Sequence, residues 1–83
     1  MIEHVDVTDD ELREARRYPV IVEWSDEDQL FLAVLPDLEG LTVHGDTPEE
    51  AVARSTDAAI EWLWGMRALG EAIPQPSSIM LSR

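Results

Sequence analysis

The chain has 83 residues, of which 45% are hydrophobic, 18 are acidic and 6 are basic, for a formal net charge of −12. This composition excludes intrinsic disorder and predicts one domain with a small hydrophobic core. The absence of cysteine excludes disulfides, a thiolate nucleophile and cysteine–zinc sites. No apolar run approaches the roughly 20 residues of a membrane helix, and the acidic N-terminus is unlike a signal peptide, so we expect a cytoplasmic protein.

Most of the negative charge lies between Tyr18 and Trp64, where eleven carboxylates accompany a single basic residue, Arg54. Such a surface repels the phosphates of nucleic acids and attracts basic proteins. We therefore expect a basic protein partner and no direct binding of nucleic acid. Simple solubility is the alternative explanation of the charge.

Residues 1–17 are predicted to form an N-terminal arm or a short helix. Thr8 precedes three acidic residues, as at many helix N-termini, and three arginines follow toward the far end. Residues 18–83 are predicted to form the main domain.

Three short segments of the main domain have the composition of β-strands. Residues 18–24 alternate in polarity, and Pro19 restricts them to an edge or to the start of a strand. Residues 30–36 are apolar on both faces, as expected of a central strand covered on each side. Residues 41–45 alternate again, so we expect a three-stranded antiparallel meander.

A helix is predicted from Pro48 to Leu69, with Gly70 as its stop. Trp64 falls outside the core-facing stripe of this helix. A short fourth strand is expected at residues 79–82, parallel to the first strand through a right-handed crossover, which makes the fold α+β. The helix is expected to turn one stripe toward the sheet, formed by Val52, Ser55, Thr56, Ala59, Trp62, Leu63 and Met66.

The segment TVHGDTPEEAV concentrates polar residues at the predicted start of this helix. Thr47 and Glu50 have the spacing of a capping box, in which each side chain accepts a hydrogen bond from the backbone of the other. Pro48 occupies the first helical position, where its missing N–H is not needed. Gly45 is expected to supply backbone freedom for the turn. The segment is therefore explained by helix initiation.

Metal binding by His44 with Asp46 and Glu49 is the alternative for the same segment, and His44 is also a conceivable general base. The chain has two histidines, no paired-histidine spacing, no nucleophile elbow and no glycine-rich phosphate loop. We therefore predict no catalytic residue, no metal site and no cofactor.

Two features are candidates for partner binding. Asp26, Glu27 and Asp28 form an acidic turn between the first two strands, although solvation is the usual role of such a turn. Trp64 lies off the core stripe, and exposed tryptophan is enriched in protein interfaces. Partial burial of Trp64 against the C-terminal tail is the alternative.

Three ordered motifs resemble those of the HicB-like antitoxin family of bacterial toxin–antitoxin systems. The resemblance covers roughly residues 18–78, and the order and separation of the motifs make it specific. The motifs are Pro36-Asp37-Leu38-Glu39-Gly40, Gly45-Asp46-Thr47-Pro48-Glu49-Glu50-Ala51 and Gly70-Glu71-Ala72-Ile73-Pro74-Gln75-Pro76-Ser77.

The resemblance implies a partial ribonuclease-H-like β-β-β-α-β fold without nuclease activity. It also implies a HicA-type toxin partner, a small basic ribonuclease that cleaves mRNA, and assembly into homodimers or tetramers. The chain departs from the family pattern in ending at Arg83 without the usual DNA-binding segment, so the resemblance does not extend to operator binding. The alternatives are an orphan homo-oligomeric interaction module without a toxin, or a residual metal-dependent nuclease.

Overall fold

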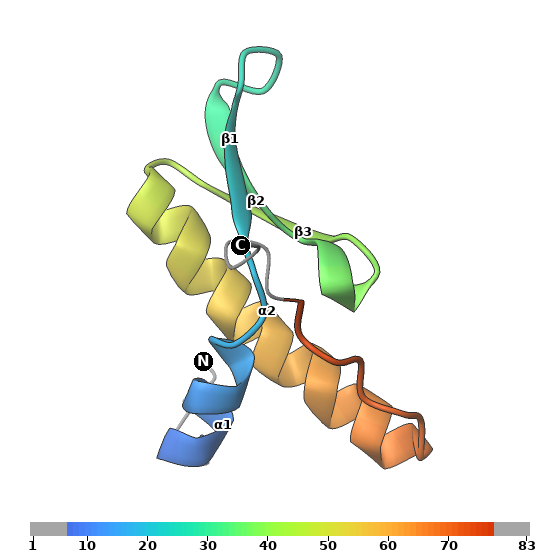
Figure 1. Ribbon diagram of the computed structural model, residues 1–83. Coiled ribbons are helices and arrows are strands. Elements are labelled where there is room, and N and C mark those ends of the chain that lie inside the picture. Colours follow the sequence, from blue (N-terminus) through green and yellow to red (C-terminus); the bar gives the residue numbers. More distant parts are fainter. Residues whose placement is uncertain (1–6, 78–83) are drawn as a thin grey trace, which may run out of the picture.

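A computed structural model describes residues 7–77 of the chain (Figure 1). Two helices, three strands and a short 3₁₀ turn form this part of the molecule. In chain order they are α1 (Asp9–Ala15), β1 (Ile21–Ser25), β2 (Leu30–Leu35), η2 (Pro36–Leu38), β3 (Leu41–Gly45) and α2 (Pro48–Leu69).

The strands form one antiparallel sheet in the order β1-β2-β3. This confirms the predicted meander, the central place of β2 and the α+β class. The strand predicted to begin at Tyr18 begins instead at Ile21, because Tyr18 is buried in the core and its N–H donates to the α1 residue Ala15. The expected fourth strand at residues 79–82 lies outside the described residues, and the ribonuclease-H-like relationship remains a prediction.

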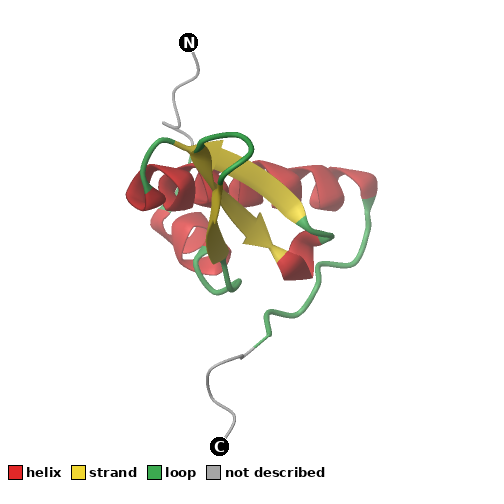
Figure 2. Ribbon diagram, turned by 90° about the horizontal axis from the view of Figure 1, so that it is seen from above, coloured by secondary structure: helices red, strands yellow, loops and turns green. Residues whose placement is uncertain are grey.

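Helix α2 crosses one face of the sheet (Figure 2). Ala33 and Leu35 of β2 point toward it and are buried, whereas Val34, on the opposite face, is only half-buried. Within residues 7–77, the predicted covering of β2 on each side is therefore complete on the α2 face and partial on the other face. The sheet-facing side of α2 is marked by its five buried residues, Ala51, Ser55, Ala59, Ile60 and Leu63.

The predicted core stripe of α2 is correct in part. Ser55, Ala59 and Leu63 are buried and Thr56, Trp62 and Met66 are half-buried, whereas Val52 is exposed and the buried Ile60 was not predicted. Val52 is 39% exposed, and Ala51 is fully buried in its place. The reason is the close approach of β3 to the first turn of α2, which only a small side chain permits.

Gly45 sets that close approach. A Cβ atom built on Gly45 would lie 2.6 Å from the backbone nitrogen of Ala51 and 3.0 Å from its Cα. Only Gly40 and Gly70 among the described glycines have a positive φ. Gly45 is therefore required for the packing of β3 against α2, and not for the backbone freedom that the sequence suggested.

The segment after α2 returns across the molecule and is held at two points. The hydroxyl of Tyr18 donates to the backbone oxygen of Pro74 at 2.6 Å. The carboxylate of Asp37 accepts from the N–H and the hydroxyl of Ser77, at 2.7 and 2.8 Å. These contacts fix residues 74–77 beside η2 and the start of β1.

Candidate interaction surfaces

The acidic turn, Asp26, Glu27 and Asp28, lies at the tip of the β1–β2 hairpin. The indole N–H of Trp24 donates to the Asp26 carboxylate at 2.7 Å, and the Ser25 hydroxyl accepts from the N–H of Asp28 at 3.1 Å. Trp24 also packs edge-on against Phe31, with ring centroids 5.0 Å apart. The turn is thus an ordered structure that presents exposed carboxylates to solvent.

Trp64 lies on α2 where α1 packs against that helix. Its side chain is 38% exposed, and its indole N–H donates to the Glu11 carboxylate at 2.8 Å. One turn further along α2, Arg67 forms a salt bridge with Glu14. Trp64 is therefore partly covered, and its hydrogen-bond partner belongs to α1.

The structure does not bring these two candidates together. The acidic turn is at the upper end of the hairpin in Figure 1, and α1, which Trp64 contacts, is at the opposite end of the molecule. Asp26, Glu27 and Asp28 are therefore one candidate surface, and Trp64 belongs to a different one. The role of both in partner binding remains a prediction.

The Glu11 carboxylate connects the two helices electrostatically. Its hydrogen bond from the Thr8 N–H holds its pKa below the ordinary value of 4.5, and the bond from Trp64 lowers the pKa further. A carboxylate whose pKa is lower in the folded state than in the unfolded chain stabilises the folded state. This stabilisation is complete at pH values above the pKa of the unfolded chain. This contribution is lost as the pH falls through the folded-state pKa.

We therefore expect α1 to loosen from α2 as the pH falls below about 4.5, the ordinary Glu11 value. Hydrogen exchange of the α1 amides measures this loosening. In the Glu11→Gln variant, the α1 amides are expected to exchange faster at neutral pH. The protection of these amides is also expected to depend less on pH than in the original chain. An unchanged pH profile in that variant would show that Glu11 does not control the contact.

The start of α2 is capped nearly as predicted. The Thr47 hydroxyl accepts from the Glu50 N–H at 3.0 Å, and Pro48 is the first helical residue. The Glu50 carboxylate, however, accepts from the Asp46 N–H at 2.6 Å, which corrects the predicted bond to Thr47. The second oxygen of Glu50 accepts a hydrogen bond from the Arg54 guanidinium at 3.1 Å.

A complete capping box is present at α1 instead. Thr8 accepts from the Glu11 N–H, and the Glu11 carboxylate accepts from the Thr8 N–H, at 3.1 and 2.9 Å. The same glutamate also holds Trp64. The spacing of Thr8 and Glu11 can be read from the sequence. The contact of Glu11 with Trp64 cannot, because the two residues are 53 positions apart and no local pattern indicates it.

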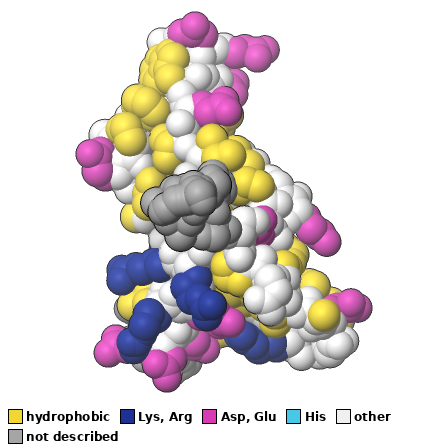
Figure 3. Space-filling model, in the orientation of Figure 1, with side chains coloured by type: hydrophobic (Ala, Val, Ile, Leu, Met, Phe, Trp, Pro, Cys, Tyr) yellow, Lys and Arg dark blue, Asp and Glu magenta, His cyan; other side chains and the backbone are white. Residues whose placement is uncertain are grey.

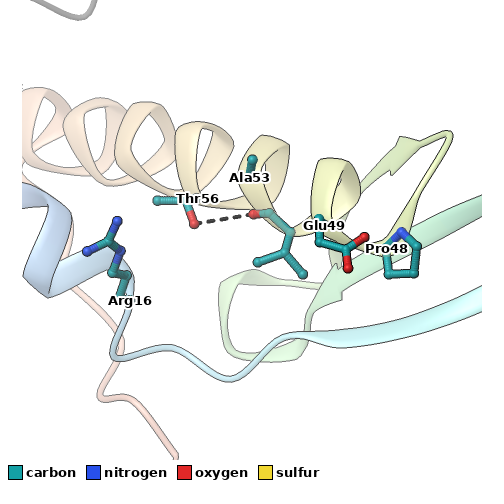
Figure 4. Close-up of a pocket in the computed structure, with 6 residues that line it drawn as sticks. Arg16, Pro48, Glu49, Ala53 and Thr56 are labelled. Atoms are coloured by element: carbon teal, nitrogen blue, oxygen red, sulfur yellow. Dashed lines mark hydrogen bonds between the residues drawn. The ribbon is translucent and has the colours of Figure 1, made fainter.

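An open groove of about 430 Å³ lies between the end of α1 and the first turns of α2 (Figure 4). Arg16 and Glu49 are its two charged side chains, and apolar atoms dominate the rest of its lining. The Thr56 hydroxyl is already bonded to the Val52 carbonyl at 3.3 Å. The groove therefore lacks the converging polar groups that fix a small substrate.

Among residues 7–77, no group of three histidine, aspartate or glutamate side chains is placed to hold a metal ion. The alternating register puts the His44 side chain on the sheet face opposite α2, whereas Glu49 belongs to the first turn of α2. The described part of the chain also has no helix long and apolar enough to span a membrane.

The family comparison matches residues 18–82 to the model described as the HicB-like antitoxin of bacterial toxin–antitoxin systems. Comparisons with curated proteins and with solved structures gave no match. The match includes the motif residues whose contacts hold the fold together, namely Asp37 with Ser77 and Gly45 with Ala51. The chain therefore belongs to the HicB-like antitoxin family.

Proposed function

We propose that this chain binds and neutralises a HicA-type toxin, a small basic ribonuclease that cleaves mRNA. The observation that carries the proposal is the family match over residues 18–82, because a toxin–antitoxin family implies a toxin partner. The identity of that toxin rests on the resemblance of the three sequence motifs.

The acidic surface supports a basic partner. The chain has a net charge of −12, and carboxylates lie at the tip of the hairpin in Figure 3. Charge of one sign steers an oppositely charged protein and speeds its association. We assign Asp26, Glu27 and Asp28 to the surface that covers the toxin, because their turn is exposed and held in place by Trp24 and Ser25.

The same proposal gives the chain no catalytic step of its own and no direct contact with nucleic acid. Its encounter with the toxin would take place in the cytoplasm, where mRNA is cleaved. We also propose self-association into a homodimer or tetramer, because a domain of this size buries a small core and exposes large hydrophobic side chains.

The experiment that tests the proposal is inhibition of RNA cleavage. A short basic protein is sought in the reading frame beside that of this chain and purified as the candidate toxin, and purified chain is added to it in increasing amounts. We expect cleavage to stop when the two proteins are equimolar. Cleavage that persists beside folded chain would favour the orphan interaction module.

A further inference from the structure

One face of α2 is covered by α1 along its second half only. Trp64 on this face donates its indole N–H to Glu11 of α1 at 2.8 Å. Glu49, Ala53 and Thr56 continue the same face toward the helix start, because residues three or four positions apart lie on one side of a helix. In this first half they line the groove of about 430 Å³ shown in Figure 4. The groove is therefore the part of the face that α1 leaves open.

Val52 brings an apolar side chain to this groove. It has the helical spacing of the core stripe, but Ala51 packs against Gly45 and Val52 stays 39% exposed. Pro48 and Ala53 extend the apolar lining. Apolar residues on one side of a helix normally lie against another element. Within the described residues 7–77, Pro48, Val52 and Ala53 are exposed instead.

The two charged side chains of the groove have no ion-pair partner within residues 7–77. Arg13, Arg54 and Arg67 form salt bridges with carboxylates, but Arg16 does not. Glu49 likewise forms no salt bridge in the described part of the chain. Figure 4 shows Arg16 and Glu49 at opposite ends of the groove. The groove thus has a free positive charge at one end and a free negative charge at the other.

Opposite charges at the two ends suit the dipole of a helix. The amino end of a helix carries a partial positive charge, and its carboxyl end carries a partial negative charge. A helix that lies in the groove with its amino end at Glu49 and its carboxyl end at Arg16 matches both. Apolar side chains on one face of that helix would pack on Val52 and Ala53, as when an amphipathic helix binds a hydrophobic groove.

We propose that the groove binds an amphipathic helix of the toxin. The proposal rests on the function proposed above and adds a second surface to the acidic turn. Charge favours the toxin over other occupants, because eleven carboxylates accompany only Arg54 between Tyr18 and Trp64. Such a surface attracts a basic protein and repels the phosphates of a nucleic acid. A second copy of this acidic chain would bring like charge to the Glu49 end.

Two alanines of α2 supply a matched test. Ala53→Gln adds a longer polar side chain inside the groove and is expected to weaken binding of the candidate toxin at least tenfold. Ala68→Gln makes the same change at an exposed position of α2 outside the groove lining, and is expected to alter binding less than twofold. Isothermal titration calorimetry measures both dissociation constants. Circular dichroism checks that both variants fold, since the two share one loss of helix propensity.

Two arginines supply a second matched pair, which tests the orientation of the helix. Arg16→Glu and Arg17→Glu each make the net charge more negative by the same amount, so both raise the long-range attraction of a basic toxin equally. Arg16 lines the groove, whereas Arg17 is exposed outside its lining. Arg16→Glu is therefore expected to bind the toxin at least fivefold more weakly than Arg17→Glu, because the carboxyl end of the helix then meets a negative charge.

The outcomes separate the groove from the function. If the original chain binds the toxin and Ala53→Gln binds it as tightly as Ala68→Gln does, the groove proposal is overturned and the proposed function stands. If the original chain does not bind the toxin, both are overturned. If Ala53→Gln weakens self-association in sedimentation equilibrium and leaves toxin binding unchanged, the occupant is a second copy of this chain and the toxin helix is overturned.

Discussion

Replacing Gly45 by alanine is expected to lower the free energy of unfolding by about 2–3 kcal/mol, within the range of overpacking substitutions. The new Cβ would lie 2.6 Å from the Ala51 nitrogen and 3.0 Å from the Glu50 carbonyl carbon. These are backbone atoms, so no side-chain rotation relieves the clash, and the first turn of α2 has to move away from β3. Urea denaturation followed by circular dichroism measures the change.

Gly65 supplies the matched control in the same protein. It lies within α2, and a Cβ atom built on it meets nothing within 4 Å. Gly65→Ala is expected to stabilise the chain by about 0.5–1 kcal/mol, the difference between glycine and alanine inside a helix. Equal stability of Gly45→Ala and the original chain would contradict the account of Gly45.

Replacing Glu27 and Asp28 by arginine, with Asp26 kept as the hydrogen-bond partner of Trp24, is expected to weaken binding of the toxin by about 2–3 kcal/mol, roughly 30-fold to 150-fold. The change sets arginines against a basic partner, and like charges across an interface repel. Isothermal titration calorimetry measures the dissociation constant.

A matched control separates a local contact from the effect of net charge. Replacing Glu39 and Glu71 by arginine changes the net charge by the same amount at exposed positions elsewhere, and is expected to alter binding less than threefold. If both double variants lose the toxin equally, net charge and not the acidic turn governs binding.

The sequence predicted most of the fold because its local signals agree with the tertiary contacts. Pro48 and Gly70 mark the two ends of α2, and the observed helix begins at Pro48 and ends just before Gly70. The apolar run at residues 30–36 correctly indicated the central strand. Helix ends and strand composition depend on neighbouring residues, and this is why pattern analysis finds them.

The features that the sequence did not predict depend on distances between segments. The need for glycine at position 45 comes from the nearness of Ala51, and the partial covering of Trp64 comes from Glu11. The half-exposed side chain of Trp24 follows from the limited reach of α2 across the sheet. No spacing of residue types along the chain encodes these three facts.

The candidate site was predicted only in part for the same reason. The exposed position of Asp26, Glu27 and Asp28 follows from a polar turn between two strands, which the sequence shows directly. Their separation from Trp64 depends on how α2 crosses the sheet (Figure 2), which no local pattern of residues determines. The partner-binding set of the sequence analysis is therefore divided into two surfaces.

The most direct measurement of the central claim is RNA cleavage by a HicA-type toxin, sought in the neighbouring reading frame, in the presence of this chain. We predict that cleavage falls in proportion to the chain added and stops at equimolar protein. We also predict that Gly45→Ala, at a temperature where it is unfolded, gives no protection. Undiminished cleavage in the presence of excess folded chain would contradict the assignment of this protein as an antitoxin of that ribonuclease.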